Sequence, residues 1–398
     1  MNGPSVVLLG FTVDNRVVNE IAKNSAVLPT QTHRFAWNLA AALESAGAVV
    51  SLVSALPIPN YPEYPKIIIR SGVVDQGQIQ GVTLGFLNLL ILKHATRFLQ
   101  CLRVGMRYIR RRRAKFIVVH GVHSPFLVFA RLIKRLLRLR IVLVMTDPPG
   151  VVRAVDGSIS RMLKRLDRRL LQSLASGFDG VICLTPALAA DFAPNVPCLI
   201  LEGFANPELA EVAQITSSTS GGLRVAYAGG ISAEYGVENL VLAFKSIDDP
   251  HARLSIYGKG PLDDWVRKQS ECDARISHCG LLAHDSLMSQ LRQSSILVNP
   301  RPSAQGFVRY SFPSKVLEYL TLGVPMVTTR LEGLSADYLR FAQVAEGDSV
   351  SALAGAIRSV ISEYGSALDR ARRGQEYVIS EKSVEAQGLK ISQFLADL

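Results

Sequence analysis

Residues 310–325 read YSFPSKVLEYLTLGVP, and this stretch predicts more about the chain than any other. Pro313 suits the first turn of a helix, because its missing N–H costs no hydrogen bond there. Ser314 and Lys315 then offer backbone N–H groups at a helix start, where anions bind, and Lys315 adds a full positive charge. Glu318 follows one turn later, placed to accept hydrogen bonds from vicinal hydroxyls. The spacing predicts a phosphate site beside a ribose site; the alternative is an ordinary capped helix with an exposed Glu.

This segment belongs to the second of two series of alternating strands and helices. In the first series we expect strands at residues 5–10, 49–54, 116–120, 141–145 and 180–184, and a helix at 31–45. In the second we expect strands at 224–227, 253–257, 276–279, 296–298 and 326–329, and helices at 237–247, 263–271, 286–293 and 315–322. Short β-branched strands that alternate with amphipathic helices are typical of buried parallel sheets. The sequence therefore predicts an α/β chain with two doubly wound, Rossmann-like domains.

A small polar run at residues 216–222 separates the two series and is typical of a linker. We expect an N-terminal domain at 1–205, a linker at 206–222, a second domain at 223–375, and a helix at 376–398 that packs back on the first domain. In open α/β sheets, ligands bind at the carboxyl ends of the strands. The two domains are therefore expected to face a shared cleft.

The positive charge of the chain is concentrated in one segment. Lys and Arg number 44 and Asp and Glu 33, which gives a net charge of +11. Residues 86–171 hold 20 Lys or Arg and only three acids, Asp147, Asp156 and Asp167, so this segment carries +17 and the remainder −6. A localised excess of this size indicates an anionic partner for the first domain.

Composition also excludes several classes of protein. Apolar residues make up 48% of the chain and charged ones 19%, so wholesale disorder is excluded. The longest apolar run, residues 81–92, has 12 residues, whereas a bilayer span needs about 20. The first residues lack the features of a signal peptide. The five cysteines show no metal-ligand spacing, which indicates buried thiols of a reducing compartment.

Four segments of the second series form a recognisable set. They are residues 227–244, which hold Gly229-Gly230; residues 254–261 with a GxG turn; residues 278–282; and residues 298–302 together with 311–325. The set resembles the GT-B glycosyltransferases and is similar to family four of the retaining enzymes, above all those of bacterial capsule and exopolysaccharide clusters. The resemblance implies a GT-B fold, a nucleotide-sugar donor on the second domain, an acceptor on the first, and a retaining hexosyl transfer.

The resemblance also implies a donor site. Its members follow strands or open the helix quoted above: Gly229, Gly230, Lys259, Gly280, Leu281, Arg301, Ser314, Lys315 and Glu318. The alternatives are that the glycines are plain turn residues, that Lys315 is a solvated helix residue, and that Arg301 braces a loop.

Two departures from the family bear on this site. Tyr310 stands where many relatives have a first Glu, and Ile231 and Tyr235 stand where many have an Arg/Lys pair. A leaving diphosphate must still be neutralised by cations or helix ends. We assign this role to Lys315 with Arg301 or Arg309. Because these cations suffice and no DxD-type cluster stands out, no metal ion or other cofactor is expected.

Polar residues at strand ends of the first domain are the candidates for handling the acceptor. His120 and His123 follow the strand at 116–120, and Asp147 follows the strand at 141–145. Each could orient or deprotonate an acceptor hydroxyl. Thr30, Thr32 and His33, which open the first long helix, are the candidates for acceptor binding. The alternatives are that the histidines are structural and that Asp147 is a turn former before Pro148.

Three cationic helical stripes account for the basic segment. They are Lys93, Arg97, Arg103, Arg107 and Arg110; then Arg131, Lys134, Arg135 and Arg138; then Arg161, Lys164, Arg165 and Arg168. Basic amphipathic helices suit anionic lipid surfaces. Simple solvated faces are the alternative, and nucleic acid is disfavoured because the segment has few aromatic residues and no nucleic-acid motif.

The sequence thus predicts a glycosyltransferase that moves a sugar from a nucleotide diphosphate donor to a glycan or lipid-linked acceptor in bacterial surface polysaccharide synthesis. We expect it in the cytoplasm, peripherally bound to the inner face of the plasma membrane. Two alternatives remain open: a nucleotide-sugar 2-epimerase of the same fold, and a non-catalytic nucleotide-binding scaffold subunit.

Overall fold

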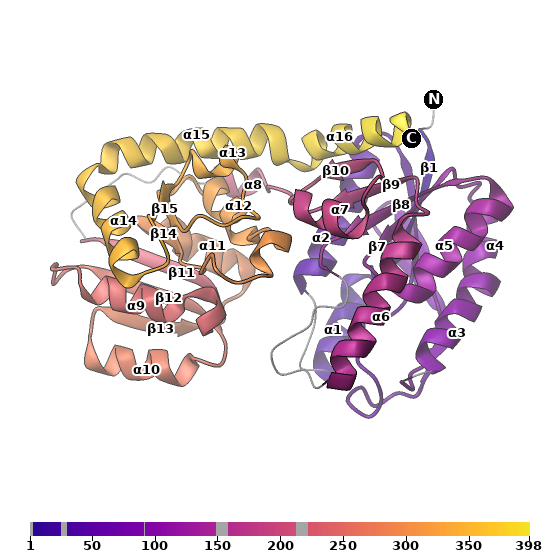
Figure 1. The fold of residues 1–398 in the computed structure, drawn as a ribbon, viewed down its shortest axis with the longest axis horizontal. Coiled ribbons are helices and arrows are strands. Elements are labelled where there is room, and N and C mark those ends of the chain that lie inside the picture. The colour runs from indigo at the N-terminus through magenta and orange to yellow at the C-terminus, as the bar shows by residue number, and fades with distance from the viewer. Residues whose placement is uncertain (1–2, 25–29, 91, 149–157, 212–221) are drawn as a thin grey trace. The chain divides into compact units, whose positions relative to one another are not determined.

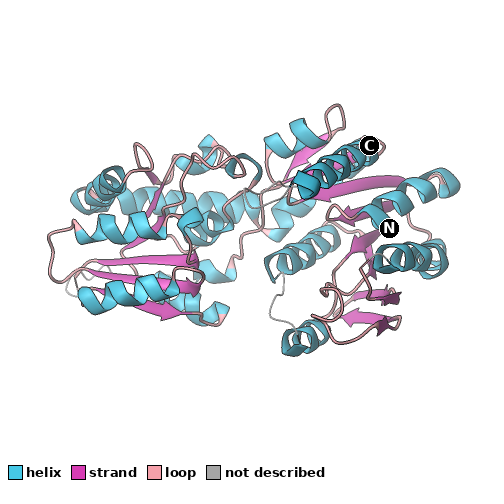
Figure 2. Cartoon of the chain, turned by 60° about the horizontal axis from the view of Figure 1, so that its bottom comes forward, coloured by secondary structure: helices cyan, strands magenta, loops and turns pink. Residues whose placement is uncertain are grey.

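The computed structural model describes residues 3–24, 30–90, 92–148, 158–211 and 222–398. The chain divides into two compact units, Met1–Glu202 with Val384–Leu398, and Gly203–Ser383. In each unit, helices cover a sheet that is parallel throughout or nearly so (Figures 1 and 2). The expected fold class, two doubly wound α/β domains, is confirmed.

The first unit is built on an eight-stranded sheet with the order β10-β9-β8-β7-β1-β2-β5-β4. Its strands are β1 (Ser5–Gly10), β2 (Val49–Ser54), β4 (Gly72–Gln76), β5 (Ile79–Thr83), β7 (Phe116–His120), β8 (Arg140–Met145), β9 (Gly180–Cys183) and β10 (Cys198–Ile200). All neighbours are parallel except β4 and β5. A separate antiparallel pair joins β3 (Ile68–Ile69) to β6 (Phe86–Leu87). The antiparallel pairs fall between residues 68 and 87, for which the sequence predicted no strands.

Helices flank this sheet. They are α1 (Asn15–Asn24), α2 (Thr30–Ser45), α3 (Leu92–Gln100), α4 (Met106–Arg111), α5 (Ser124–Leu137), α6 (Ser158–Ala175), α7 (Pro186–Phe192) and α16 (Val384–Asp397). A π-helical turn, η1 (Cys101–Gly105), joins α3 to α4. α5 packs between α3 and α6 and against β7 and β8, whereas α16 lies along α2. The contact between α16 and α2 is close: a Cβ at Gly388 would lie 2.2 Å from the carbonyl oxygen of Ala42.

One part of the predicted cationic stripe is wrong. Lys93 and Arg97 are only 5% and 4% exposed, so they do not face solvent or a partner. Lys93 Nζ donates to the Ile58 carbonyl at 2.6 Å, and Arg97 donates to the Leu56 carbonyl at 3.0 Å. The Arg97 guanidinium also lies 4.1 Å from the centre of the Phe86 ring. Burial lowers the pKa of Lys93 to about 8 and that of Arg97 to about 10.

The second unit is built on an all-parallel sheet with the order β13-β12-β11-β14-β15-β16. Its strands are β11 (Arg224–Gly230), β12 (Arg253–Lys259), β13 (Ile276–Gly280), β14 (Ile296–Asn299), β15 (Met326–Thr328) and β16 (Gln343–Val344). Its helices are α8 (Glu208–Glu211), α9 (Val237–Lys245), α10 (Asp263–Cys272), α11 (His284–Arg292), α12 (Ser314–Thr321), α13 (Ala336–Leu339), α14 (Val350–Ser362) and α15 (Tyr364–Lys382), with 3₁₀ turns η3 (Ala233–Tyr235) and η4 (Val308–Tyr310). Side chains from β11, α9 and α14, such as Val225, Phe244 and Ile357, fill its core.

The segment expected to be a linker, 206–222, holds a short helix in the described part. The Leu209 carbonyl in α8 accepts a hydrogen bond from Arg292 at 2.6 Å, which ties α8 to α11 of the second unit. All of the polar run at 216–222 except Gly222 lies outside the described residues. The C-terminal helical segment is two helices: α15 belongs to the second unit and α16 to the first.

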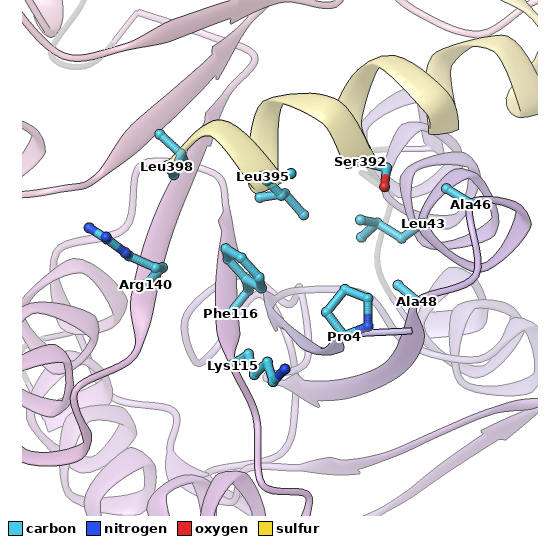
Figure 3. A pocket seen from close by; sticks show the side chains of 11 residues that line it. Pro4, Leu43, Ala46, Ala48, Lys115, Phe116, Arg140, Ser392, Leu395 and Leu398 are labelled. Carbon is cyan, nitrogen blue, oxygen red and sulfur yellow. The ribbon is translucent and has the colours of Figure 1, made fainter. Parts of the chain in front are cut away.

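A cavity of about 410 Å³ lies in the first unit, where α16 passes over the amino ends of the strands (Figure 3). Lys115, Phe116 and Arg140, at the starts of β7 and β8, help to line it. None of the candidate site residues lines this cavity. In the described part of the chain, no helix is both long and apolar enough to span a membrane.

Candidate functional site

The candidate donor residues of the second unit gather at the carboxyl edge of its sheet. The strand order reverses between β11 and β14, and such a switch point is where open α/β sheets bind ligands. The loops after these two strands touch, because a Cβ at Gly236 would lie 2.0 Å from the Pro300 carbonyl oxygen. β11 and β12 are equally close: a Cβ at Gly258 would lie 1.8 Å from the carbonyl oxygen of Gly229. The glycines at 229 and 258 therefore serve close backbone packing at the site.

Arg301 is a buried cation beside this edge. It is 6% exposed, and its guanidinium lies 4.7 Å from the centre of the Phe307 ring and 5.4 Å from that of Tyr235. It donates to Ser311 Oγ at 3.3 Å, while its Nε has no hydrogen-bond partner among the described residues. Burial lowers its pKa from the ordinary value. Arg301 therefore places a buried positive charge at this edge, and an anion pairs favourably with such a charge.

The predicted anion site opens α12. The helix starts at Ser314, which is exposed, with Pro313 in extended conformation before it. Lys315 Nζ and Glu318 Oε2 form an ion pair at 2.7 Å, and both side chains are about one-fifth exposed. The two residues assigned to phosphate and ribose are thus adjacent and partly accessible. Their mutual ion pair neutralises both charges in this structure.

The remaining donor candidates differ in accessibility. Lys259 ends β12 with an exposed side chain, beside Gly230 on β11. Gly280 ends β13 with a φ of +66° and open space where a Cβ would stand, and Leu281 after it is 72% exposed. Arg309 lies 3.5 Å from Glu332, so this cation is paired within the loop region.

Two aromatic features of this site were missed from the sequence. Tyr319 is fully buried in α12, and its hydroxyl accepts a hydrogen bond from the Ala228 N–H at 2.9 Å. This contact anchors α12 to β11, next to Gly229. The second feature is the pair of aromatic rings, Tyr235 and Phe307, that lie beside Arg301. A Tyr beside the matched Glu318 gives no signal of its own in a helical pattern, because any core helix carries such residues.

In the first unit, the two histidines after β7 are enclosed. His120 is 2% exposed and stacks on Phe35, with ring centres 5.8 Å apart and an angle of 12° between the planes. His123 packs against Phe11, Phe126 and His94, with Nε2 3.5 Å from an Arg97 nitrogen. His120 ends β7 as expected, and its burial favours the alternative that this histidine is structural.

Asp147 and the start of α2 are the more accessible acceptor candidates. Asp147 is exposed after β8 and accepts a hydrogen bond from Thr146 Oγ1 at 2.9 Å. His33 Nε2 donates to the Val13 carbonyl at 2.7 Å, so this ring anchors the loop after β1. Thr32 is half-buried beside it, and the side chain of Thr30 lies outside the described residues.

Lowering the pH from 7 to 5 is expected to destabilise the first unit. Burial lowers the pKa of His120 to about 4 and, together with Arg97, that of His123 to about 3. Below about pH 6.5 these two histidines therefore bind protons in the unfolded chain but stay neutral in the folded unit. The free energy of unfolding consequently falls as the pH is lowered. We expect each of the two histidines to contribute a loss of about 2 kcal/mol at pH 5, about 4 kcal/mol together, measured by urea unfolding with amide exchange of β7 as the probe.

The matched variants for this test are His120→Gln, which should reduce the pH dependence, and His251→Gln at an exposed position, which should leave it intact. Equal unfolding free energies of the wild type at pH 7 and pH 5 would contradict the prediction.

Among the described residues, no group of three or more His, Cys, Asp or Glu side chains is placed to hold a metal ion. Charged groups at the second unit's sheet edge include Arg301, Lys315, Glu318 and the exposed Lys259. This edge offers cations and a helix start for an anion, with one carboxylate for hydroxyl groups.

Each of the two units matches a family model of known proteins. A family model described as glycosyl transferases group 1 matches residues 222–363, and one described as glycosyl transferase 4-like domain matches residues 32–197. No curated protein matches the chain by sequence.

Solved structures share the fold along the whole chain. Sucrose-phosphate synthase from Thermosynechococcus elongatus is 14% identical, with 99% of each chain covered and a TM-score of 0.70. Anabaena HepE in complex with UDP is 13% identical, with 99% and 100% covered and a TM-score of 0.66. The apo form of the lipopolysaccharide outer core galactosyltransferase WaaB is 11% identical, with 99% and 100% covered and a TM-score of 0.63. The two family models lie one on each unit, and together with this fold they show that the chain is a GT-B glycosyltransferase, with a glycosyl transferase 4-like domain followed by a group 1 glycosyl transferase domain.

Proposed function

We propose that the chain transfers a sugar from a nucleotide diphosphate donor to a glycan or lipid-linked acceptor, with retention at the anomeric carbon. The observation that carries the proposal is the pairing of Lys315 and Glu318 at the start of α12. A cation at a helix start and a carboxylate one turn on match a diphosphate followed by a ribose. The UDP bound to the similar Anabaena protein supports this donor class.

In the reaction, the bond between the anomeric carbon and the diphosphate oxygen breaks, and an acceptor hydroxyl oxygen forms the new bond to that carbon. The diphosphate leaves with the electron pair. Lys315, the N–H groups that open α12, and the positive charge of Arg301 stabilise its negative charge. Glu318 holds the ribose once the donor has displaced it from Lys315.

The acceptor hydroxyl must lose a proton as it attacks. We assign this proton to Asp147, because its carboxylate is exposed at the end of β8 whereas His120 is enclosed. Arg309 also aids the leaving group in this proposal, after its ion pair with Glu332 opens. No metal ion enters this scheme.

We place the reaction on the cytoplasmic face of the bacterial plasma membrane, in surface polysaccharide synthesis. The support is the charge of residues 86–171, which hold three acids and 20 Lys or Arg, the buried Lys93 and Arg97 among them. Anionic lipids attract such a segment, and a lipid-linked acceptor would be presented there.

The donor half of the proposal predicts that UDP or GDP binds the wild type in the micromolar range by calorimetry. Glu318→Ala should weaken that binding about 10- to 100-fold, because it removes hydrogen bonds from a charged group to the ribose. The matched control is Glu271→Ala on α10, which is exposed and should bind as the wild type does. If neither nucleotide binds the wild type below millimolar concentrations, the donor assignment is wrong.

The transfer half is tested by incubating the bound nucleotide-sugar with and without a lipid extract. A new glycolipid supports the proposal, and its anomeric configuration decides the retaining outcome. Epimerised donor in the absence of any acceptor would instead identify an isomerase. Nucleotide binding without turnover in either incubation would identify a scaffold subunit.

A further inference from the structure

Helices α5 and α6 each expose a second apolar face. On α5 the exposed residues are Val128, Leu132 and Leu136, and on α6 they are Met162, Leu166 and Leu170. Both sets are spaced by four residues, so each forms one ridge along its helix. The six side chains are between 39% and 57% exposed. We call these two sets the apolar ridges.

The apolar ridges are separate from the faces that form the core. α5 packs Phe126, Phe129 and Ile133 against the sheet, all fully buried, and α6 buries Leu171 and Ala175. A helix that covers a sheet needs only one apolar face, and its outer face is normally polar. A second apolar ridge on two adjoining helices therefore indicates a further partner for this layer (Figure 1).

Arginines accompany the apolar ridges in a repeated pattern. An Arg directly precedes five of the six ridge residues, in Arg131-Leu132, Arg135-Leu136, Arg161-Met162, Arg165-Leu166 and Arg169-Leu170. Arg135, Arg165 and Arg169 are exposed. α5 contains no acidic residue and α6 contains one, Asp167. The charge next to the ridges is thus strongly positive and favours an anionic partner.

The combination of apolar and cationic side chains decides between the anionic partners. A nucleic acid would use the arginines and leave the leucines in water, and no aromatic residue stands on the ridges to stack a base. A bilayer with anionic lipids uses both, because the leucines enter the boundary between headgroups and acyl chains while the arginines reach the phosphates.

We infer that the apolar ridges of α5 and α6 dock the first unit on an anionic bilayer, with Leu132, Leu136, Met162, Leu166 and Leu170 inserted below the phosphates. This inference deepens the membrane location given under the proposed function and rests on it. It differs from attraction by charge alone in one respect. Salt should weaken the binding without abolishing it, because the apolar part is not screened.

The experiment is sedimentation of the whole chain with vesicles of phosphatidylcholine, with or without an equal share of phosphatidylglycerol, at low and high salt. We expect binding only to the vesicles with phosphatidylglycerol. The variant Met162→Gln/Leu166→Gln/Leu170→Gln should bind them at least tenfold more weakly at both salt concentrations, since three side chains no longer leave water. Arg165→Gln/Arg169→Gln should lose about tenfold at low salt and little at high salt.

The matched control is Leu242→Gln/Ile361→Gln/Leu389→Gln, which removes three comparably exposed aliphatic side chains from helices outside the ridges. It should sediment with vesicles as the wild type does. Calorimetry with UDP or GDP and circular dichroism of each variant report whether the fold and the donor site are intact, so a loss of vesicle binding is not confused with unfolding.

Three results would overturn the inference. Vesicle binding of the α6 variant equal to wild type would show that the ridges are not the docking surface, while the membrane location would stand. If the wild type does not bind phosphatidylglycerol vesicles at low salt, both the docking surface and the membrane location are wrong. Nucleotide binding and sugar transfer are tested by the separate experiments given above. A wild type that self-associates in solution through α6, and binds no vesicles, would make the ridges a protein interface.

Discussion

Replacing Lys315 by Ala is expected to lower the turnover of the enzyme about 100- to 1,000-fold, the usual effect of removing one preorganised group that stabilises a developing negative charge. In the structure Lys315 Nζ is held 2.7 Å from Glu318 at the start of α12. Its charge would face the diphosphate as the bond to the sugar breaks. Arg301 is a buried cation at the same sheet edge, and in the described part of the chain its side chain donates to Ser311, so it offsets only part of the loss.

Steady-state kinetics with a saturating acceptor measures this effect as kcat and as kcat/KM for the donor. Lys315→Arg keeps a positive charge and should recover part of the rate, whereas a structural role would show as equal damage in both variants. The matched control is Lys268→Ala, an exposed lysine of α10 in the same unit, which should leave the rate unchanged. A Lys315→Ala enzyme with wild-type kcat would refute the assignment of the diphosphate site.

Replacing Gly258 by Ala is expected to cost about 3 kcal/mol of stability in the second unit, since it combines a steric clash with a strained backbone. Gly258 has a φ of +142°, and its Cβ would lie 1.8 Å from the Gly229 carbonyl oxygen. Either β12 or the loop after β11 must move. Because Gly229 and Gly230 end β11 at the candidate donor site, nucleotide binding should fall together with stability.

Thermal unfolding and calorimetry with UDP or GDP measure the two parts of this prediction. Gly355→Ala in α14 is the matched control: a Cβ there has open space, and alanine favours a helix, so stability should rise slightly. A Gly258→Ala protein with wild-type stability and nucleotide binding would show that the strands at the donor edge tolerate a wider separation than the structure gives them.

The buried parallel strands could be predicted closely from the sequence. β1, β2 and β7 have the predicted bounds, and α12 begins one residue before the expected start. Such strands are short, β-branched and flanked by turn residues, so periodicity and turns agree. β4 and β5 were missed because they form an antiparallel pair at the edge of the sheet, with Val73 75% exposed. A strand that is half solvated lacks the apolar run on which the prediction depended.

Contacts between residues close in sequence could be predicted, because helical spacing alone determines them. Contacts that depend on tertiary packing could not. Lys315 and Glu318 are three residues apart on one helix, so their proximity follows from helical spacing alone. Arg97 and Lys93 show the limit. They share a helix face, but the loop carbonyls at Leu56 and Ile58 that bury them lie about 35 to 41 residues earlier in the chain. A cation count treats a buried arginine and an exposed one alike.

The first unit is completed by α16, whose Gly388 packs against Ala42 of α2, although the whole second unit precedes α16 in the chain. During synthesis the ribosome therefore releases every residue of the second unit before it releases the helix that finishes the first. The second unit can then fold before the first, in the reverse of their order in the chain. Residues 203–383 are contiguous and can fold while the face of α2 that α16 covers is still exposed. A nascent chain arrested after Ser383 should resist protease in the second unit and remain sensitive along α2.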